Sequence, residues 1–284
     1  MKLGLVMGGG GIVGIAWETG VLAGLQEECG FDPGAATVIM GSSAGSVIGA
    51  QAALGRDLDE LVAIQQRPPS AAGGPRQTPD FTNGPQAEIM RLMTAGGGQE
   101  QAVRMGELAM KAETFLSEEA FVDSFRSMIG SERWPEIALR VTSCDCTSGE
   151  GVVWSRDSAI DLVRAVASSC AIPGFFPTVG FNGRRYMDGP RGQGHTARIL
   201  SDAGVDAALF IGPLAALAQF SSMMDAELEL VRAAGIELHT VTGGPELAAI
   251  GPNLMDISVR ATGVDAGLAD GRAAAQEMNW LAGV

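Results

Sequence analysis

The feature that most constrains the fold is the segment from residue 36 to residue 55, ATVIMGSSAGSVIGAQAALG. Its β-branched start at 37–40 predicts a buried strand, and the small apolar residues that follow predict a helix over 44–54. Between them, residues 41–45 have the sequence GSSAG and the pattern G-x-S-x-G. A strand that turns sharply into a helix at this pattern is the context of a nucleophile elbow. The segment predicts an α/β fold with Ser43 as candidate nucleophile; the alternative is that Ser43 is only a small residue in a tight turn.

Strand and helix patterns alternate along the whole chain of 284 residues. Such alternation is typical of a mostly parallel sheet covered by helices on both faces. We therefore expect one domain over 1–284, a three-layer α/β/α sandwich. The predicted strands are 2–7, 36–40, 137–144, 151–155, 180–187, 205–211 and 236–242. The predicted helices are 13–28, 44–54, 58–66, 86–94, 100–112, 117–129, 158–168 (capped by Asp157 or Ser158), 196–203, 224–234 and 264–282.

Residues 67–114 differ in character from the rest, because glycine and proline pairs interrupt them repeatedly. The two helical pieces in this insertion, over 86–94 and 100–112, carry several methionines. Methionine side chains adapt to varied apolar shapes, which suits an acyl chain. We expect a lid-like insertion or a wall of the substrate site, with a plain surface excursion as the alternative.

Charge and cysteine usage narrow the possible partners. The chain has 33 acidic and 19 basic residues, a net charge of −14. That balance argues against a nucleic-acid partner and against electrostatic docking on anionic membranes, but it allows apolar contact with lipid. The four cysteines form no CxxC pair, and the first residues lack the pattern of an export signal. We expect reduced structural thiols in a cytoplasmic protein without metal or cofactor, with transient contact at a membrane surface and the oligomeric state left open.

A glycine-rich loop follows the first predicted strand, since residues 4–14 are GLVMGGGGIVG. Gly9, Gly11 and Gly14 satisfy G-x-G-x-x-G, the fingerprint of a dinucleotide site. The second strand lacks the acidic residue that would hold the ribose, which weakens that hypothesis. An oxyanion hole is the competing use, because consecutive glycines let several N–H groups converge beside a helix N-terminus. Loop and Ser43 lie at neighbouring strand ends, so we favour the oxyanion hole over a nucleotide site or a plain turn.

A serine nucleophile needs a group that accepts its proton. Asp188 follows the predicted strand 180–187 and precedes a glycine, a position that places a carboxylate at the rim of a site. An aspartate that only caps the strand end is the alternative. The chain contains two histidines, His195 and His239, and either would complete the order Ser-Asp-His of an α/β-hydrolase triad. His195 suits a helix cap or surface position better, and His239 suits packing within a strand.

Taken as a set, these segments resemble the patatin-like phospholipase family. The resemblance rests on the glycine loop at 8–14, GSSAG at 41–45, ASSCAIPGFFP at 167–177 and YMDG at 186–189, in the family's order. Asp145, with the residues to Glu150, also resembles a family segment. The resemblance implies a lipid acyl hydrolase with a Ser–Asp dyad and no histidine. Ser43 would be the nucleophile, Asp188 the base, and the N–H groups of the loop the oxyanion hole; the loop residues are Gly9, Gly10 and Gly11.

Two departures from the family pattern stand out. Val13 occupies a position where the family usually has lysine or arginine, and Pro190 follows Asp188-Gly189 where glycine or alanine is usual. Both affect the expected rate and substrate preference more than the fold. Alternative functions are a catalytically silent member that binds lipid or a partner protein, and a nucleotide-binding protein that uses the glycine loop. Acyl length, head group, positional specificity and the choice between hydrolysis and acyl transfer are not determined by the sequence.

Overall fold

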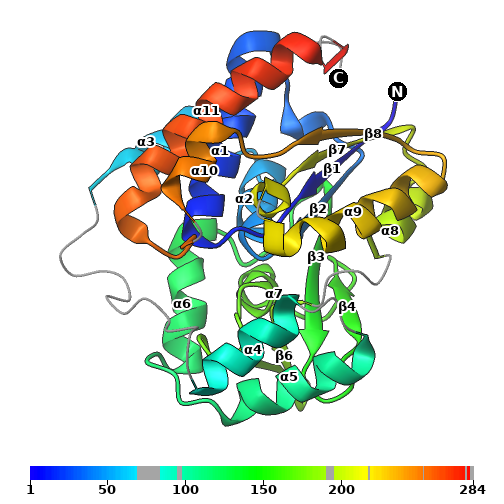
Figure 1. Ribbon diagram of the computed structural model, residues 1–284. Coiled ribbons are helices and arrows are strands. Elements are labelled where there is room, and N and C mark those ends of the chain that lie inside the picture. The colour runs from blue at the N-terminus through cyan, green and yellow to red at the C-terminus, as the bar shows by residue number, and fades with distance from the viewer. Residues whose placement is uncertain are drawn as a thin grey trace.

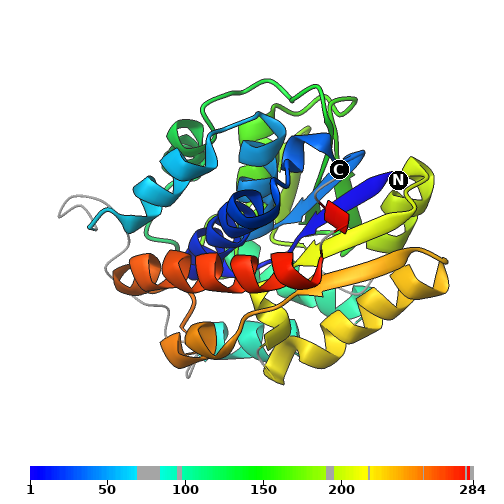
Figure 2. The same ribbon diagram turned by 90° about the horizontal axis from the view of Figure 1, so that it is seen from above.

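The computed structural model describes residues 1–68, 84–94, 98–189, 195–216, 218–251, 253–278 and 280–281. Within these residues an eight-stranded sheet runs through the molecule, with helices on both faces (Figures 1 and 2). The strands are β1 (Leu3–Met7), β2 (Val38–Ser42), β3 (Ala138–Asp145), β4 (Gly151–Trp154), β5 (Val179–Phe181), β6 (Arg184–Met187), β7 (Ala207–Ile211) and β8 (Glu237–Val241). The helices are α1 (Gly11–Cys29), α2 (Ala44–Ala53), α3 (Leu58–Gln66), α4 (Gly84–Thr94), α5 (Gln99–Lys111), α6 (Glu118–Ile129), α7 (Leu162–Ser169), α8 (His195–Ala203), α9 (Ala218–Ala233), α10 (Pro245–Ile250) and α11 (Arg260–Glu277).

The sheet is mostly parallel, as predicted. Its strand order is β5-β6-β3-β2-β1-β7-β8, and β4 pairs with the free edge of β3. Strands β3, β2, β1, β7 and β8 are joined by parallel pairing, whereas β4 and β6 run antiparallel to β3 and β5 runs antiparallel to β6. Because parallel strands end at the same edge of a sheet, the loops that follow β1 and β2 lie side by side there.

Both faces of the sheet are buried, which explains why β1 is apolar at nearly every position. Leu5 and Met7 of β1 belong to the larger core, with residues of α1 and α2. Val6 points the other way and belongs to a second core with Leu200 of α8 and Leu228 of α9. Successive strand residues face opposite sides, so the helices must form two layers. The predicted three-layer arrangement is therefore confirmed.

Helix α1 is fixed by an unusually close contact with α11, which runs beside it (Figure 2). A Cβ at Gly267 would lie 2.1 Å from the carbonyl oxygen of Trp17, and one at Gly20 would lie 2.3 Å from that of Val264. Only glycine permits such an approach of two helix backbones. The Trp17 indole also donates a hydrogen bond to Asp270 of α11 (2.7 Å). The N-terminus of α1, which carries the glycine loop, is thus held by a rigid support.

Several predicted boundaries were wrong. The helix predicted over 224–234 begins at Ala218, the helix predicted over 264–282 is Arg260–Glu277, and α10 was not predicted. The predicted strand 180–187 is a hairpin of β5 and β6, and Asn182 (φ 49°) and Gly183 (φ 72°) form its turn. Asn-Gly is the usual pair for a two-residue hairpin loop, because both positions need a positive φ. The helix predicted over 158–168 begins instead at Leu162, because the Asp161 carboxylate accepts the N–H of Arg164 (2.9 Å) and caps it.

The insertion predicted at 67–114 contains two helices in its described part, α4 and α5, while 69–83 and 95–97 lie outside the described residues. Ile89 of α4 and Met105 of α5 belong to an apolar cluster that also includes Cys144 and Met187 of the sheet. Helix α5 contacts the sheet closely, since a Cβ at Gly106 would lie 2.0 Å from the carbonyl oxygen of Cys146. In the described ranges, no helix is long and apolar enough to cross a membrane.

Candidate active site

Ser43 occupies the sharp turn between β2 and α2, and it is almost fully buried. Its backbone has φ 53° and ψ −124°, a conformation that a residue with a side chain rarely adopts. The turn fits tightly against the end of β1: the N–H of Gly45 donates to Gly8 O (2.7 Å), and a Cβ at Gly45 would lie 2.2 Å from Met7 O. Gly45, the second glycine of G-x-S-x-G, is therefore required because no side chain fits there. The segment has the strand, sharp turn and helix that the sequence predicted.

Three hydrogen bonds with side chains hold the main chain of Ser43 in this strained conformation. Its N–H donates to Ser169 Oγ (2.8 Å), and its carbonyl oxygen accepts from Ser46 Oγ (2.7 Å) and Cys170 Sγ (3.2 Å). Strained residues persist only where their surroundings hold them in place. Ser169 and Cys170 perform this task from the end of α7. Their segment was noted in the sequence for its family pattern, but nothing local to it indicated a contact with residue 43.

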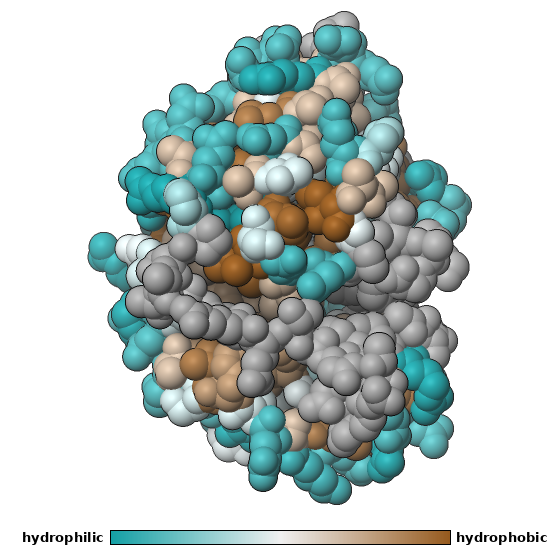
Figure 3. All heavy atoms as spheres, turned by 60° about the vertical axis from the view of Figure 1, so that its left-hand side comes forward, coloured by the Kyte–Doolittle hydropathy of each residue, from teal (hydrophilic) through white to brown (hydrophobic). Residues whose placement is uncertain are grey.

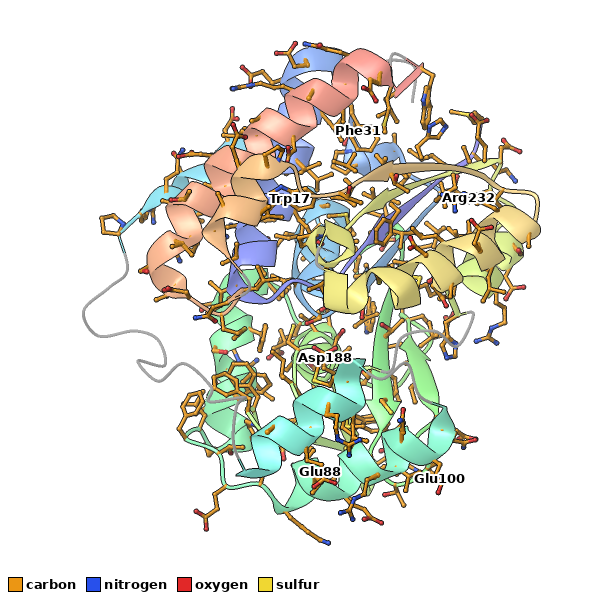
Figure 4. All side chains as sticks on the ribbon, in the orientation of Figure 1. Trp17, Phe31, Glu88, Glu100, Asp188 and Arg232 are labelled. Carbon is orange, nitrogen blue, oxygen red and sulfur yellow. The ribbon has the colours of Figure 1, made fainter. Side chains whose placement is uncertain are left out.

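Asp188 reaches the same place from the opposite direction. In the parallel pairing of β2 with β3, Ser42 lies opposite Thr142; in the antiparallel pairing of β6 with β3, Met187 lies opposite Cys144. Strand β4 pairs with both Thr142 and Cys144, so β2 and β6 both lie along the opposite edge of β3. The next residue of each strand, Ser43 and Asp188, therefore reaches the level between those two positions. Asp188 is almost fully buried and lies beside α7 (Figure 4). Its N–H donates to Ala171 O (2.9 Å).

Electrostatic effects on the thiols support this closeness. Burial raises the pKa of Cys170 above the ordinary thiol range, and the negative charge of Asp188 raises it further. Burial also raises the pKa of Cys144 to about 12, with Cys146, Asp145 and Asp188 contributing. Cys170 is therefore within electrostatic range of Asp188 while it is hydrogen-bonded to Ser43. All four cysteines are free thiols, and we expect the three buried ones, Cys144, Cys146 and Cys170, to be unreactive at neutral pH.

The glycine loop lies between β1 and the N-terminus of α1. Gly8 donates to Ile211 O (2.8 Å) and Gly10 O accepts from Gly14 (2.7 Å), which fixes both ends of the loop. Gly11 has φ 61°, and a Cβ there would lie 2.8 Å from Leu254 O. Among the described residues, no main-chain carbonyl accepts a hydrogen bond from the N–H groups of Gly9, Gly10 or Gly11. These groups sit at the positive end of the helix dipole, beside the elbow.

The two histidines have separate positions in the fold. His239 lies within β8 and is three strands away from β2; its Nε2 is 3.0 Å from Glu237 Oε1, and its ring packs on Trp280. His195 begins α8, on the sheet face opposite α2. Burial lowers the pKa of His195, and the charge of Arg198 lowers it further, while Glu227 opposes them. An uncharged imidazole at neutral pH follows from these effects.

Two residues depart from the family pattern, and the structure describes one of them, Val13. Val13 is fully buried, and its Cγ1 would lie 3.2 Å from a Cβ at Gly263 of α11. The side chain at this position therefore packs between helices, where a charged group would be costly. Pro190 lies outside the described residues. Across the part of the chain that the structure describes, no group of three or more His, Cys, Asp or Glu side chains is arranged to hold a metal ion.

The family described as Patatin-like phospholipase matches residues 5–190, more than half of the chain. The chain therefore belongs to the patatin-like phospholipase family. Membership supports lipid hydrolysis as the broad activity.

Two solved structures also resemble the chain at low identity. VipD from Legionella pneumophila is 14% identical with a TM-score of 0.44, over 96% of this chain and 67% of VipD. The type III effector protein ExoU is 17% identical with a TM-score of 0.42, over 98% of this chain and 53% of ExoU. The chain thus spans about half the length of ExoU.

Proposed function

We propose that the chain is a serine lipid acyl hydrolase of the phospholipase A, lysophospholipase or carboxylesterase type, in which Ser43 and Asp188 form a catalytic dyad. The main support is the segment of residues 169–171, which is hydrogen-bonded to the main chains of both residues at once. Both side chains are buried, and the register of β2 and β6 on β3 supports placing them at the same level of the sheet, beside the glycine loop. Acyl transfer requires this set of groups: a nucleophile, a base and a site for the oxyanion.

The reaction proceeds in two halves. Ser43 Oγ attacks the ester carbonyl carbon while Asp188 accepts the hydroxyl proton. The carbonyl π electrons move to oxygen, and the N–H groups of Gly9, Gly10 and Gly11 stabilise the resulting oxyanion. When the intermediate collapses, the C–O bond to the alcohol breaks and Asp188 returns the proton to that oxygen. Asp188 then deprotonates a water molecule that attacks the acyl-enzyme, and the fatty acid leaves as Ser43 recovers its proton.

Asp188 suits the role of base because of its surroundings. An ordinary aspartate has a pKa of about 4 and accepts protons poorly at neutral pH. Asp188 is only 4% exposed. Burial shields this carboxylate from bulk water, so the proton can pass directly from the serine hydroxyl to Asp188. The N-terminus of α1 is the positive end of its helix dipole and stabilises negative charge nearby. It therefore favours both the oxyanion and the carboxylate of the departing fatty acid.

The apolar surroundings suit an acyl chain. Ile89, Leu92 and Met105 of α4 and α5 pack against Met187, the residue before Asp188. Met255 lies on the other side, where its Sδ would be 2.8 Å from a Cβ at Gly11. Figure 3 shows hydrophobic residues gathered near the middle of a face that is otherwise largely hydrophilic. The close contact at Gly106 favours a fixed wall over a moving lid for α5.

The test is hydrolysis of p-nitrophenyl acyl esters together with labelling by a fluorophosphonate. Ser43→Ala is expected to abolish both, and Asp188→Asn to lower kcat by at least about a hundredfold, as expected for loss of a general base. His195→Ala and His239→Ala are expected to keep most of the activity. Ser127→Ala, which changes an exposed serine on α6, is the matched control for Ser43→Ala.

Three outcomes would contradict the proposal. Full activity in Ser43→Ala would show that another group is the nucleophile. A loss of about a hundredfold in either histidine variant would favour a triad instead. Lipid binding by a wild-type protein that resists the label and hydrolyses no ester would indicate a catalytically silent family member. A panel of lipid substrates then defines chain length and head group.

A further inference from the structure

Glu18 of α1 is a fully buried carboxylic acid, and within the described part of the chain neither of its oxygens makes a hydrogen bond of full geometry. The polar group that acts on it is the main chain of Gly8, where the glycine loop begins. Leaving a buried polar group without a partner costs about 1–3 kcal/mol. Residues that break such a rule of folding without an evident gain mark functional or strained sites. A carboxyl group at this position needs an explanation that simple packing does not provide.

Glu18 lies on the side of α1 that faces the proposed site. In a helix, residues four apart share a face, and side chains lean toward the N-terminus. The Glu18 side chain therefore leans over Gly14 toward the glycine loop. A Cβ at Gly14 would lie 3.3 Å from Ala44 Cβ and 3.9 Å from the carbonyl carbon of Gly9. This face of α1 thus meets the residue after Ser43 and the loop itself.

The environment keeps Glu18 uncharged. Burial raises the pKa of this carboxyl group well above its usual range, and the main chain of Gly8 opposes that effect only in part. The charge state matters because an anion beneath the loop would repel the oxygen that becomes negative in the transition state. An ionised Glu18 would also act on Cys170, the thiol that is hydrogen-bonded to Ser43 O.

We propose that Glu18 is a positioning residue of the oxyanion site: its buried carboxyl group presents a polar surface to Gly8, where the glycine loop begins, and keeps the loop's N–H groups turned toward the substrate oxygen. The inference rests on the proposed function of the site. Its role is distinct from that of Gly9, Gly10 and Gly11, because Glu18 acts through the loop and does not touch the reacting atoms.

The test compares Glu18→Gln with Glu18→Leu. Glutamine keeps the size, polarity and neutral charge, whereas leucine keeps only the approximate volume. We expect Glu18→Gln to keep kcat within about threefold and Glu18→Leu to lower kcat at least about tenfold, less than loss of a direct oxyanion donor. KM should change little in either variant. The Tm of Glu18→Leu should equal or exceed that of the wild type, because an unpaired polar group is removed.

Thr19→Val is the matched control, since Thr19 is equally buried on α1 but its hydroxyl bonds to Ile15 O within the helix (2.7 Å). That variant should keep its kcat. Glu18→Met, with a flexible side chain, replaces Glu18→Leu if the leucine variant does not fold. Wild-type kcat in the apolar variant, or an equal loss in Glu18→Gln, would overturn the inference. If the proposed function itself is wrong, the result is different: the wild-type protein neither reacts with the fluorophosphonate nor hydrolyses esters. The inference about Glu18 is then wrong as well.

Discussion

The main chains of Ser43 and Asp188 are both hydrogen-bonded to one run of three consecutive residues, 169–171. Ser169 Oγ accepts the N–H of Ser43 at 2.8 Å, and Ala171 O accepts the N–H of Asp188 at 2.9 Å. Cys170, between them, donates to Ser43 O at 3.2 Å. A proton transfer depends steeply on the distance between the two groups. One short rigid segment therefore sets the geometry of the proposed dyad.

Replacing Ser169 with alanine is expected to damage catalysis more than stability. The change leaves the N–H of Ser43 buried without an acceptor, at a cost of about 1–3 kcal/mol. A misplacement of the nucleophile by about 1 Å can cost about a hundredfold in rate, so kcat should fall at least about tenfold. Ester hydrolysis and thermal unfolding measure the two effects.

Ser168→Ala is the control for this prediction. Ser168 neighbours Ser169 on α7 and is equally buried, but its Oγ bonds to Ser143 and Trp154. We expect a comparable fall in Tm with kcat preserved. Equal effects of the two substitutions on kcat would show that Ser169 does not position the nucleophile.

Gly267→Ala should destabilise the fold strongly. A Cβ there would lie 2.1 Å from Trp17 O, which is backbone and cannot yield. Overpacking of this kind costs about 1–3 kcal/mol or more, which outweighs the gain of about 1 kcal/mol in helix propensity. Gly263→Ala makes the same change on the same helix, but its Cβ would meet the Val13 side chain at 3.2 Å. The midpoint of urea unfolding should be clearly lower for Gly267→Ala than for Gly263→Ala. Similar midpoints would show that the contact between α1 and α11 is not rigid.

Acid should destabilise the protein partly through Asp145. Burial raises the pKa of this carboxyl group, but hydrogen bonds from Ser148 and Thr147 and the charge of Arg184 (2.8 Å) lower it below its usual range. A group whose pKa is lower in the folded state adds stability above its unfolded pKa, about 3.9, and loses it as the pH falls through the folded pKa.

Asp145→Asn is the variant that tests this contribution. It should be less stable than the wild type at pH 7, and the difference should shrink between about pH 5 and pH 2. Chemical unfolding at a series of pH values measures both. Asp123→Asn, at an exposed position on α6, should change little. A stability gap for Asp145→Asn that is constant with pH would rule out the proposed titration.

The buried thiols are expected to resist alkylation. Burial raises the pKa of Cys144 and Cys146 to about 12 and that of Cys170 still further, so the reactive thiolate is scarce at pH 8. In a Cys29→Ser variant, a thiol reagent such as iodoacetamide should react slowly with the native protein and rapidly after unfolding in urea. Rapid labelling of the native protein would mean that one of these cysteines is accessible and ionised.

Local sequence signals were sufficient for much of this architecture. The elbow at Ser43 and the glycine loop follow from short-range chemistry, because a glycine-bounded strand-to-helix turn needs no distant partner to be recognised. The same holds for α4 and α5 within the insertion. The Asn182-Gly183 pair is an equally local signal, and it divides the strand predicted over 180–187 into two.

The sequence by itself determined the fold class, the order of the elements and the segments from which a nucleophile, a base and an oxyanion loop would come. Only the tertiary structure decided how they fit together: the register that brings β2 and β6 to one edge of β3, the Ser169 contact with Ser43, and the burial of Glu18. The physical reason is the distance along the chain over which each effect acts. Propensity and periodicity act over a few residues, whereas these contacts join positions more than a hundred residues apart or depend on packing against helices that local sequence does not specify.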